Sequence, residues 1–109
     1  MKLNTEKALA KLGNDISLYQ FLTQSLIDEL PLHIEELKKS RDSFNTESAA
    51  RTAHVIKGHL LMFGCEIDAA TCNHSQNELI QCQHHDACKA LITPLIEITS
   101  SFLVALKSQ

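Results

Sequence analysis

Apolar residues recur at steps of three and four along almost the whole chain, which is the spacing of α-helices that bury one face. Residues that cap or end helices interrupt this pattern at four places. The pattern predicts a short helix from Asn4 or Thr5 to about Leu12, and four long helices that begin at Asp15, at Asn45 or Thr46, at Glu66 and at Asp86. Short connections between such helices indicate an all-α fold, an antiparallel up-and-down four-helix bundle with a short N-terminal helix, in a single domain over residues 1–109.

Three of the long helices carry a clear apolar stripe that we expect to be buried. In the second helix the stripe consists of Leu18, Phe21, Leu22, Leu26, Leu30, Ile34 and Leu37. In the third helix, which Gly64 ends, it consists of Ala49, Ala53, Ile56, Leu60 and Phe63. In the last helix it consists of Cys88, Leu91, Ile92, Leu95, Thr99, Phe102, Leu103 and Leu106.

The remaining elements have weaker signals. The fourth helix, to Gln81, has a thin stripe made of Ile67, Ala70, Thr71, Leu79 and Ile80, and its polar middle allows a break near Asn77. Residues 42–45 and 82–85 are expected to be loops. Pro31 and Pro94 fall inside helical patterns that resume at once, so we expect kinks rather than helix ends.

Composition narrows what such a bundle can do. The 109 residues are 44% apolar with a net charge of -3 and no basic stripe, which argues against binding to nucleic acid. No apolar run approaches the roughly 18 residues of a membrane span, and the N-terminus lacks an apolar signal core. We therefore expect a cytoplasmic protein without direct membrane contact, whose reduced thiols are Cys65, Cys72, Cys82 and Cys88.

One face of the third helix is unusual, because it combines His54, Lys57 and Gly58 at helical spacing, with Arg51 one turn earlier. A neutral imidazole is a competent nucleophile and general base. Glycine in a helix costs about 1 kcal/mol relative to alanine, so its presence suggests that a side chain there would crowd the ring. Lys57 and Arg51 bring positive charge to any anion attached to His54. Leu61 adds an apolar residue where a partner can dock.

This segment resembles the signature of histidine-containing phosphotransfer (HPt) domains, which has an Ala-His pair, an apolar residue, Lys-Gly, and a glycine six residues further on. The matching residues are Ala53, His54, Ile56, Lys57, Gly58 and Gly64. The likeness extends to residues 9–15 with Tyr19 and Phe21, and to the proline in the second helix. Departures from the pattern are the bulky His59, Leu60 and Leu61 where the family usually has small residues, Asp68 where it has Leu, and Ser75-Gln76 where it has Leu-Glu.

The resemblance implies a role in a multistep phosphorelay. His54 would take a phosphoryl group from the aspartate of a receiver domain and pass it to a second response-regulator receiver. Lys57 would orient the group, Gly58 would give clearance, and Leu61 and His59 would influence which partner docks. Such domains are not independent enzymes and hold no cofactor of their own, because the receiver supplies Mg²⁺. We expect a monomer, either free-standing or part of a hybrid sensor histidine kinase.

Two other functions remain open at this point. A metal-binding bundle is suggested by three motifs, Cys72-x-His74, Cys82-x-His84 and His85-x-x-Cys88. None of them is a paired Cys-x-x-Cys set, and His54 and His59 do not share a helix face, so no metal site is predicted. A non-catalytic adaptor would only dock partners, and its function would survive the change His54→Gln.

Overall fold

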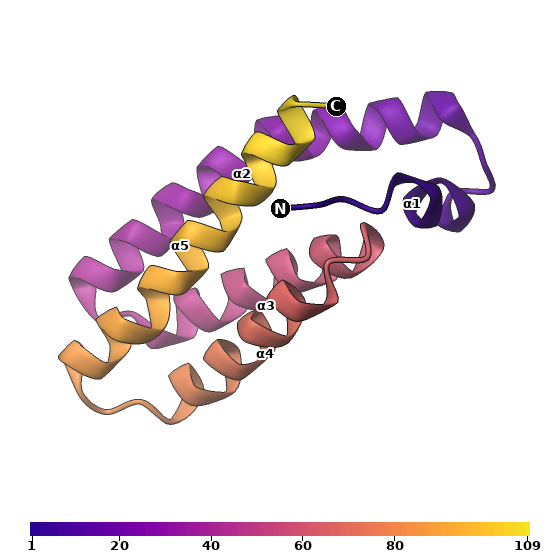
Figure 1. Ribbon diagram of the computed structural model, residues 1–109. Helices are drawn as coiled ribbons and strands as arrows, with labels where there is room; N and C mark the ends of the chain where they lie inside the picture. Colours follow the sequence, from indigo (N-terminus) through magenta and orange to yellow (C-terminus); the bar gives the residue numbers. More distant parts are fainter.

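The computed structural model describes all 109 residues and contains five helices and no strand. The helices are α1 (Thr5–Lys11), α2 (Ile16–Ser43), α3 (Thr46–Met62), α4 (Glu66–Gln81) and α5 (His85–Lys107). Helices α2 to α5 form an elongated antiparallel bundle, and α1 folds back against one end of it (Figure 1). The predicted fold class is confirmed.

Asparagine and aspartate side chains fix where three of the helices begin. The Oδ1 atoms of Asn4, Asp15 and Asn45 each accept a hydrogen bond of 3.0 Å from the backbone N–H three residues further on. Each bond satisfies a donor that has no partner within its helix. These starts agree with the sequence prediction and select Asn4 and Asn45 as the caps.

The predicted end of α2 and the predicted start of α5 were both wrong. Helix α2 continues to Ser43, and Phe44 ends it in the left-handed conformation with φ 55°. Helix α5 begins at His85, so the predicted cap Asp86 lies in its first turn, where a carboxylate suits the helix dipole. The ring of Phe44 stacks on that of His85 with the centroids 5.2 Å apart, and this contact leaves little loop at this end of the bundle.

The predicted stripe of α3 is fully confirmed, and that of α5 forms the opposite wall of the same core. All five stripe residues of α3 are buried, and those of α5 are buried or half-buried. Gly64 ends α3 with φ +72°, a conformation that glycine adopts without strain. A Cβ atom there would also lie 2.9 Å from the Cβ of Asn4, so the N-terminal segment can pack against this end only because residue 64 is glycine.

Of the predicted stripe of α4 only Leu79 is buried, and the rest of the buried face differs from the one predicted. Its buried residues are Ala69, Cys72, Ser75 and Leu79, and the helix runs unbroken past Asn77. Ile67 and Ile80, which the prediction placed in the core, are 85% and 67% exposed. Small buried residues allow close approach of two helices, and α4 packs more extensively against α3 than any other pair of helices does. Hydropathy alone overlooks such a face.

The first turns of α2 also differ from the prediction. Leu18 and Phe21 are exposed rather than buried, at 44% and 71%. Helix α2 is the longest, with 28 residues, and its N-terminal turns reach past the end of α5 (Figure 1). Near them lie α1, the last turns of the chain and Phe63, whose ring packs on Tyr19, so on the side of Leu18 and Phe21 the apolar period continues where there is little core to cover it.

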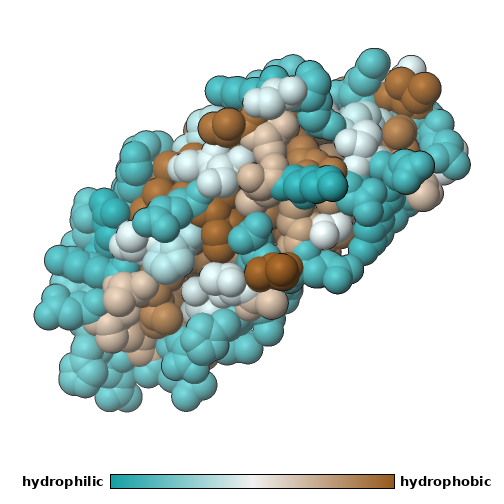
Figure 2. Space-filling model, viewed as in Figure 1, coloured by the Kyte–Doolittle hydropathy of each residue, from teal (hydrophilic) through white to brown (hydrophobic).

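Helix α5 is long and apolar enough to cross a membrane by length and composition alone, contrary to the expectation that no segment approaches this length. In the folded chain it packs mainly against α2, with its apolar stripe turned to the core. The face seen in Figure 2 has hydrophilic residues along both rims and apolar residues gathered along its middle. A core helix of a bundle meets the same criterion, so the composition of α5 does not by itself indicate a membrane.

Candidate functional site

His54 stands on the outer face of α3 and is exposed, as predicted. Its neighbours Ala53 and Ile56 are fully buried, so they fix the rotation of the helix and turn the imidazole outward. The side chain has no hydrogen-bond partner within the chain. The ring is therefore free to react with a group that approaches from solvent.

A groove of about 770 Å³ opens beside His54, between α3 and α4. Its walls are Thr46, Glu47, Ala50, Arg51, His54, Val55, Gln76 and Ile80. Val55 and Ile80 are exposed apolar residues, and the Oε1 atom of Gln76 is enclosed without a hydrogen-bond partner. The histidine thus stands at the edge of a surface that has both apolar and polar binding groups.

Lys57 leans from α3 onto α4. Its Nζ donates a hydrogen bond to the Oδ1 of Asn73 at 3.2 Å, and no carboxylate lies within ion-pair distance of it. The side chain is half-buried. Lys57 therefore lies one turn from His54 with a single neutral partner.

Arg51 lies one turn from His54 on the other side, as the spacing predicted. Its Nη1 contacts the Oε1 of Glu47 at 3.1 Å, and both side chains are largely exposed, at 69% and 84%. Exposed pairs of this kind contribute little to stability and exchange readily. Arg51 is thus available to an incoming anion only if that anion displaces Glu47.

The space above Gly58 is open. A Cβ atom built there would meet nothing within 4 Å, so a methyl group would not contact the imidazole of His54. The expectation that a side chain at this position would crowd the ring was therefore wrong within the chain itself. The clearance lies on the solvent side, where a group bound to the ring or a docked partner would need it.

The three bulky residues after Gly58 have different positions. Leu61 is 40% exposed on the same face as His54, as its spacing predicted, and its docking role stays a prediction. Leu60 is fully buried. His59 was predicted to lie at the docking face, but it turns toward α2, where its Nε2 lies 3.6 Å from Glu29. Helical geometry explains this, because five positions rotate the side chain by about 140° from His54.

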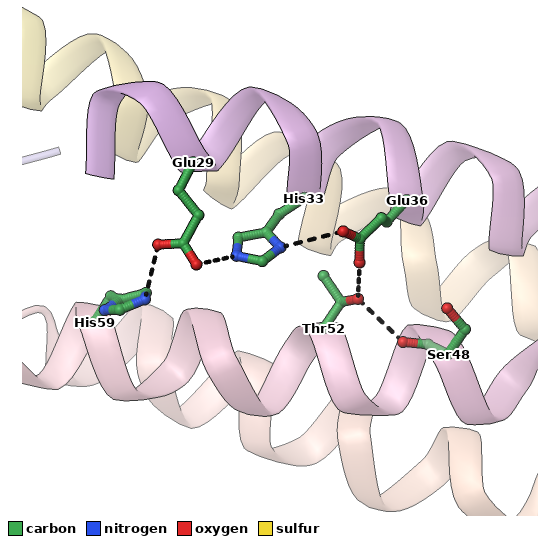
Figure 3. A network of polar contacts seen from close by, with 6 residues as sticks. All are labelled: Glu29, His33, Glu36, Ser48, Thr52 and His59. Carbon is green, nitrogen blue, oxygen red and sulfur yellow. Dashed lines mark hydrogen bonds and ion pairs between the residues drawn. The ribbon is translucent and has the colours of Figure 1, made fainter. Parts of the chain in front are cut away.

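His59 belongs to a polar network between α2 and α3 that the sequence did not reveal (Figure 3). One oxygen of Glu29 lies 3.6 Å from His59, and the other lies 3.1 Å from the Nε2 of His33. Glu36 lies 3.9 Å from the Nδ1 of His33 and accepts a hydrogen bond of 3.3 Å from the hydroxyl of Thr52. The sequence holds one signal for this network. Glu29, His33 and Glu36 stand at i, i+4 and i+7 in α2, which places them on one face of the helix.

Burial lowers the pKa of His59 below its ordinary value of 6.5, and the positive charge of His33 adds to this effect. Glu29 opposes it by raising the pKa of His59, but desolvation is the larger cause. His59 is thus held largely neutral near pH 7. A surface histidine of ordinary pKa takes up its proton at a higher pH than His59 does.

The fold does not assemble a metal site from the three motifs that suggested one. Cys72 and Cys88 are buried in the core, whereas His74 and His84 are exposed. All four cysteines are unpaired, and burial raises the pKa of the Cys72 thiol to about 12. No three His, Cys, Asp or Glu side chains are placed to hold a metal ion together.

Comparison with known proteins places this geometry in a structural context. No protein-family model matches the chain, and no curated protein does. The crystal structure of the HPt domain from a sensor hybrid histidine kinase of Shewanella superimposes with a TM-score of 0.79, over 97% of this chain and 91% of that one. The chain has the fold of that HPt domain. The two sequences are 18% identical, so this likeness concerns the fold, and the roles of the site residues depend on the contacts described above.

Proposed function

We propose that this chain is a histidine phosphotransfer domain of a two-component phosphorelay. His54 accepts a phosphoryl group from the aspartate of one receiver domain and passes it to the aspartate of another response regulator. The observation that carries the proposal is the exposed, unpartnered imidazole of His54 on an HPt-like bundle, with Lys57 one turn away and open space above Gly58.

The transfer is a simple exchange of bonds at phosphorus. The unprotonated nitrogen of the neutral His54 imidazole attacks the phosphorus of the receiver's aspartyl phosphate, while the other ring nitrogen keeps its proton. A P–N bond forms as the P–O bond to the aspartate breaks, and the aspartate leaves as a carboxylate. The reverse exchange, with the carboxylate of a second receiver as nucleophile, returns His54 to its starting state.

The chain supplies charge and access for this step, and its partner supplies the metal. The ammonium of Lys57 stabilises negative charge on the phosphoryl oxygens, and Arg51 assists once it has left Glu47. In this proposal the domain is an intermediate carrier rather than an enzyme, and the neighbours Lys57 and Arg51 supply positive charge rather than a general base. The receiver holds the Mg²⁺ that activates its aspartyl phosphate.

The receiver docks over the groove between α3 and α4. Val55, Leu61 and Ile80 offer exposed apolar contacts around His54, and Gly58 leaves room for the partner to approach the ring. Both receivers use the same histidine, so they bind in turn to one face of a monomer. Such a relay acts in the cytoplasm, with or without a sensor kinase on the same polypeptide.

Phosphorylated receivers test the proposal directly. Receiver domains encoded in the same genome are each phosphorylated with acetyl phosphate and Mg²⁺ and then incubated with the chain. At least one is expected to produce an acid-labile, alkali-stable phosphoprotein. The His54→Gln variant should take up no label, whereas the control His74→Gln, which changes an exposed histidine on α4, should label normally.

Label on His54→Gln would overturn the assignment to this residue. If no receiver labels the wild-type chain, and His54→Gln still supports signalling in cells, the chain is an adaptor that only docks partners.

A further inference from the structure

The hydrogen bond from Lys57 to Asn73 connects the proposed site to α4. A lysine side chain has four rotatable bonds and a compact ammonium, so an exposed lysine spreads its charge over a wide volume. Here the Nζ of Lys57 lies 3.2 Å from the Oδ1 of Asn73. The positive charge of Lys57 also opposes the raised pKa of Cys72, the residue that precedes Asn73 and is buried in α4. Both observations place the ammonium over α4.

Asn73 continues the line of α4 residues that face His54. Gln76 and Ile80 line the groove beside the histidine, and Asn73 lies three positions before Gln76, on the same helical face. The backbone at Asn73 is held by the neighbouring Cys72, which is fully buried against the core. Asn73 is itself exposed, and its side chain offers Lys57 an acceptor from a fixed backbone position at one end of the site.

We propose that Asn73 is a positioning residue for phosphoryl transfer, whose side-chain carbonyl holds the ammonium of Lys57 beside His54 without neutralising it. The inference deepens the proposed function and rests on it. Asn73 touches neither the phosphoryl group nor the imidazole, and it acts only through Lys57.

The neutrality of the amide is central to this role. An ammonium has three N–H donors, and Asn73 occupies one of them. The other two and the whole charge remain available to the oxygens of a phosphoryl group on His54. Arg51 shows the contrasting case, because its partner Glu47 is a carboxylate that cancels its charge until it is displaced. An aspartate at position 73 would keep an acceptor in place but remove the net charge.

A partner-free reaction isolates this effect. Phosphoramidate transfers its phosphoryl group to imidazole: the P–N bond of the reagent breaks, a new P–N bond to the ring forms, and ammonia leaves with the ring proton. The chain is incubated with phosphoramidate, and mass spectrometry of its peptides measures the initial rates at His54 and at the exposed His84. The ratio of the two rates cancels differences in reagent and protein concentration.

Asn73→Ala is expected to lower this ratio about three- to tenfold, the effect of losing one exposed hydrogen bond of ordinary strength. Asn73→Asp should lower it at least as much, because it neutralises Lys57. The matched control Asn77→Ala, which removes an exposed asparagine one turn further along α4, should leave the ratio unchanged. Circular dichroism and thermal unfolding establish that the variants fold alike.

The variant Lys57→Ala tests whether Asn73 acts through Lys57. It should lower the ratio by itself, and adding Asn73→Ala to it should have no further effect. The inference is overturned if Asn73→Ala or Lys57→Ala leaves the ratio at the wild-type value, or if Asn73→Ala lowers it equally with and without Lys57.

The two proposals fail in different experiments. If receivers do not transfer phosphate to His54 but the ratio shows coupling between Lys57 and Asn73, the proposed relay is wrong, and the pair still favours phosphorylation of His54. If receivers do transfer phosphate but the coupling is absent, the relay stands and the role of Asn73 is wrong.

Discussion

His54 and His59 lie on the same helix, yet the structure gives them opposite surroundings. His54 faces solvent beside an open groove, with cations on both sides and no partner for its ring. His59 faces α2, half-buried, in a network with Glu29 and His33. The comparison teaches that one helix can leave one histidine accessible from solvent and enclose another against a neighbouring helix. The same side chain placed between two helices contributes to packing.

The largest difference is expected in phosphoryl transfer itself. His54→Gln should abolish labelling by a phosphorylated receiver, because it removes the nucleophile. His59→Gln should retain labelling within about threefold of wild type, since His59 lies on the other side of the helix from the groove. Initial rates with one receiver at fixed concentration measure both. A loss of transfer in His59→Gln, with the fold intact, would contradict the division of α3 into two faces.

The free energy of unfolding should depend more on the side of α3 that faces α2 than on the side that carries His54. Glu29→Ala removes the acceptor that both histidines face, and should lower the free energy of unfolding by about 1–3 kcal/mol, because the enclosed ring of His33 loses its hydrogen bond. The control Glu47→Ala breaks the exposed pair with Arg51 and should change it by less than about 0.5 kcal/mol. Urea unfolding followed by circular dichroism measures both. Equal effects would mean that the network is no more than a surface ion pair.

Gly58→Ala should separate stability from transfer at the exposed face. A methyl group there meets no atom within 4 Å, so the variant should gain up to about 1 kcal/mol of stability from the helix propensity of alanine. Transfer from a receiver should slow, because the methyl group occupies space that the partner needs. Phosphorylation by phosphoramidate should hardly change. A rate with the receiver equal to wild type would show that Gly58 is not needed for docking.

How much the sequence predicts depends on whether a feature lies within one helix. The site residues His54 and Lys57 share one helical face, so their proximity follows from local geometry. The partner of Lys57 does not, because Asn73 reaches it only through the register of α4 against α3. The same holds for Glu29, whose contact with His59 depends on how α2 packs on α3.

The fold shows the same limit in its packing. The stripe of α3 was predictable because Ala53 and Ile56 combine hydropathy with regular spacing. The buried face of α4 was not, because Ala69 and Ser75 are buried for their small size while Ile67 is left in solvent. Hydropathy ranks residues by their cost of exposure. Close approach of two helices selects them by volume, and the sequence pattern does not record which helices approach closely.

The smallest expected effect is the dependence of stability on pH that His59 brings on the α2 side of α3. The pKa of His59 is lowered in the folded chain, so between its folded value and the ordinary value of 6.5 the unfolded chain binds more protons. The contribution of His59 is therefore fully present above about pH 6.5 and is lost as the pH falls through its lower folded value. Glu29, Glu36 and His33 are the titratable groups that face it or its network across the interface.

Urea unfolding of the wild-type chain should therefore show a gradual loss of stability from about pH 7.5 to about pH 5.5. The total loss due to His59 should not exceed about 1.4 kcal/mol for each unit by which its pKa is lowered. His59→Gln should flatten this dependence, because the group that resists protonation is gone. The control His74→Gln removes an exposed imidazole and should leave the slope as in wild type. A slope that persists in His59→Gln would assign the effect to other groups, and a rise in stability toward acid pH would reverse the direction argued for His59.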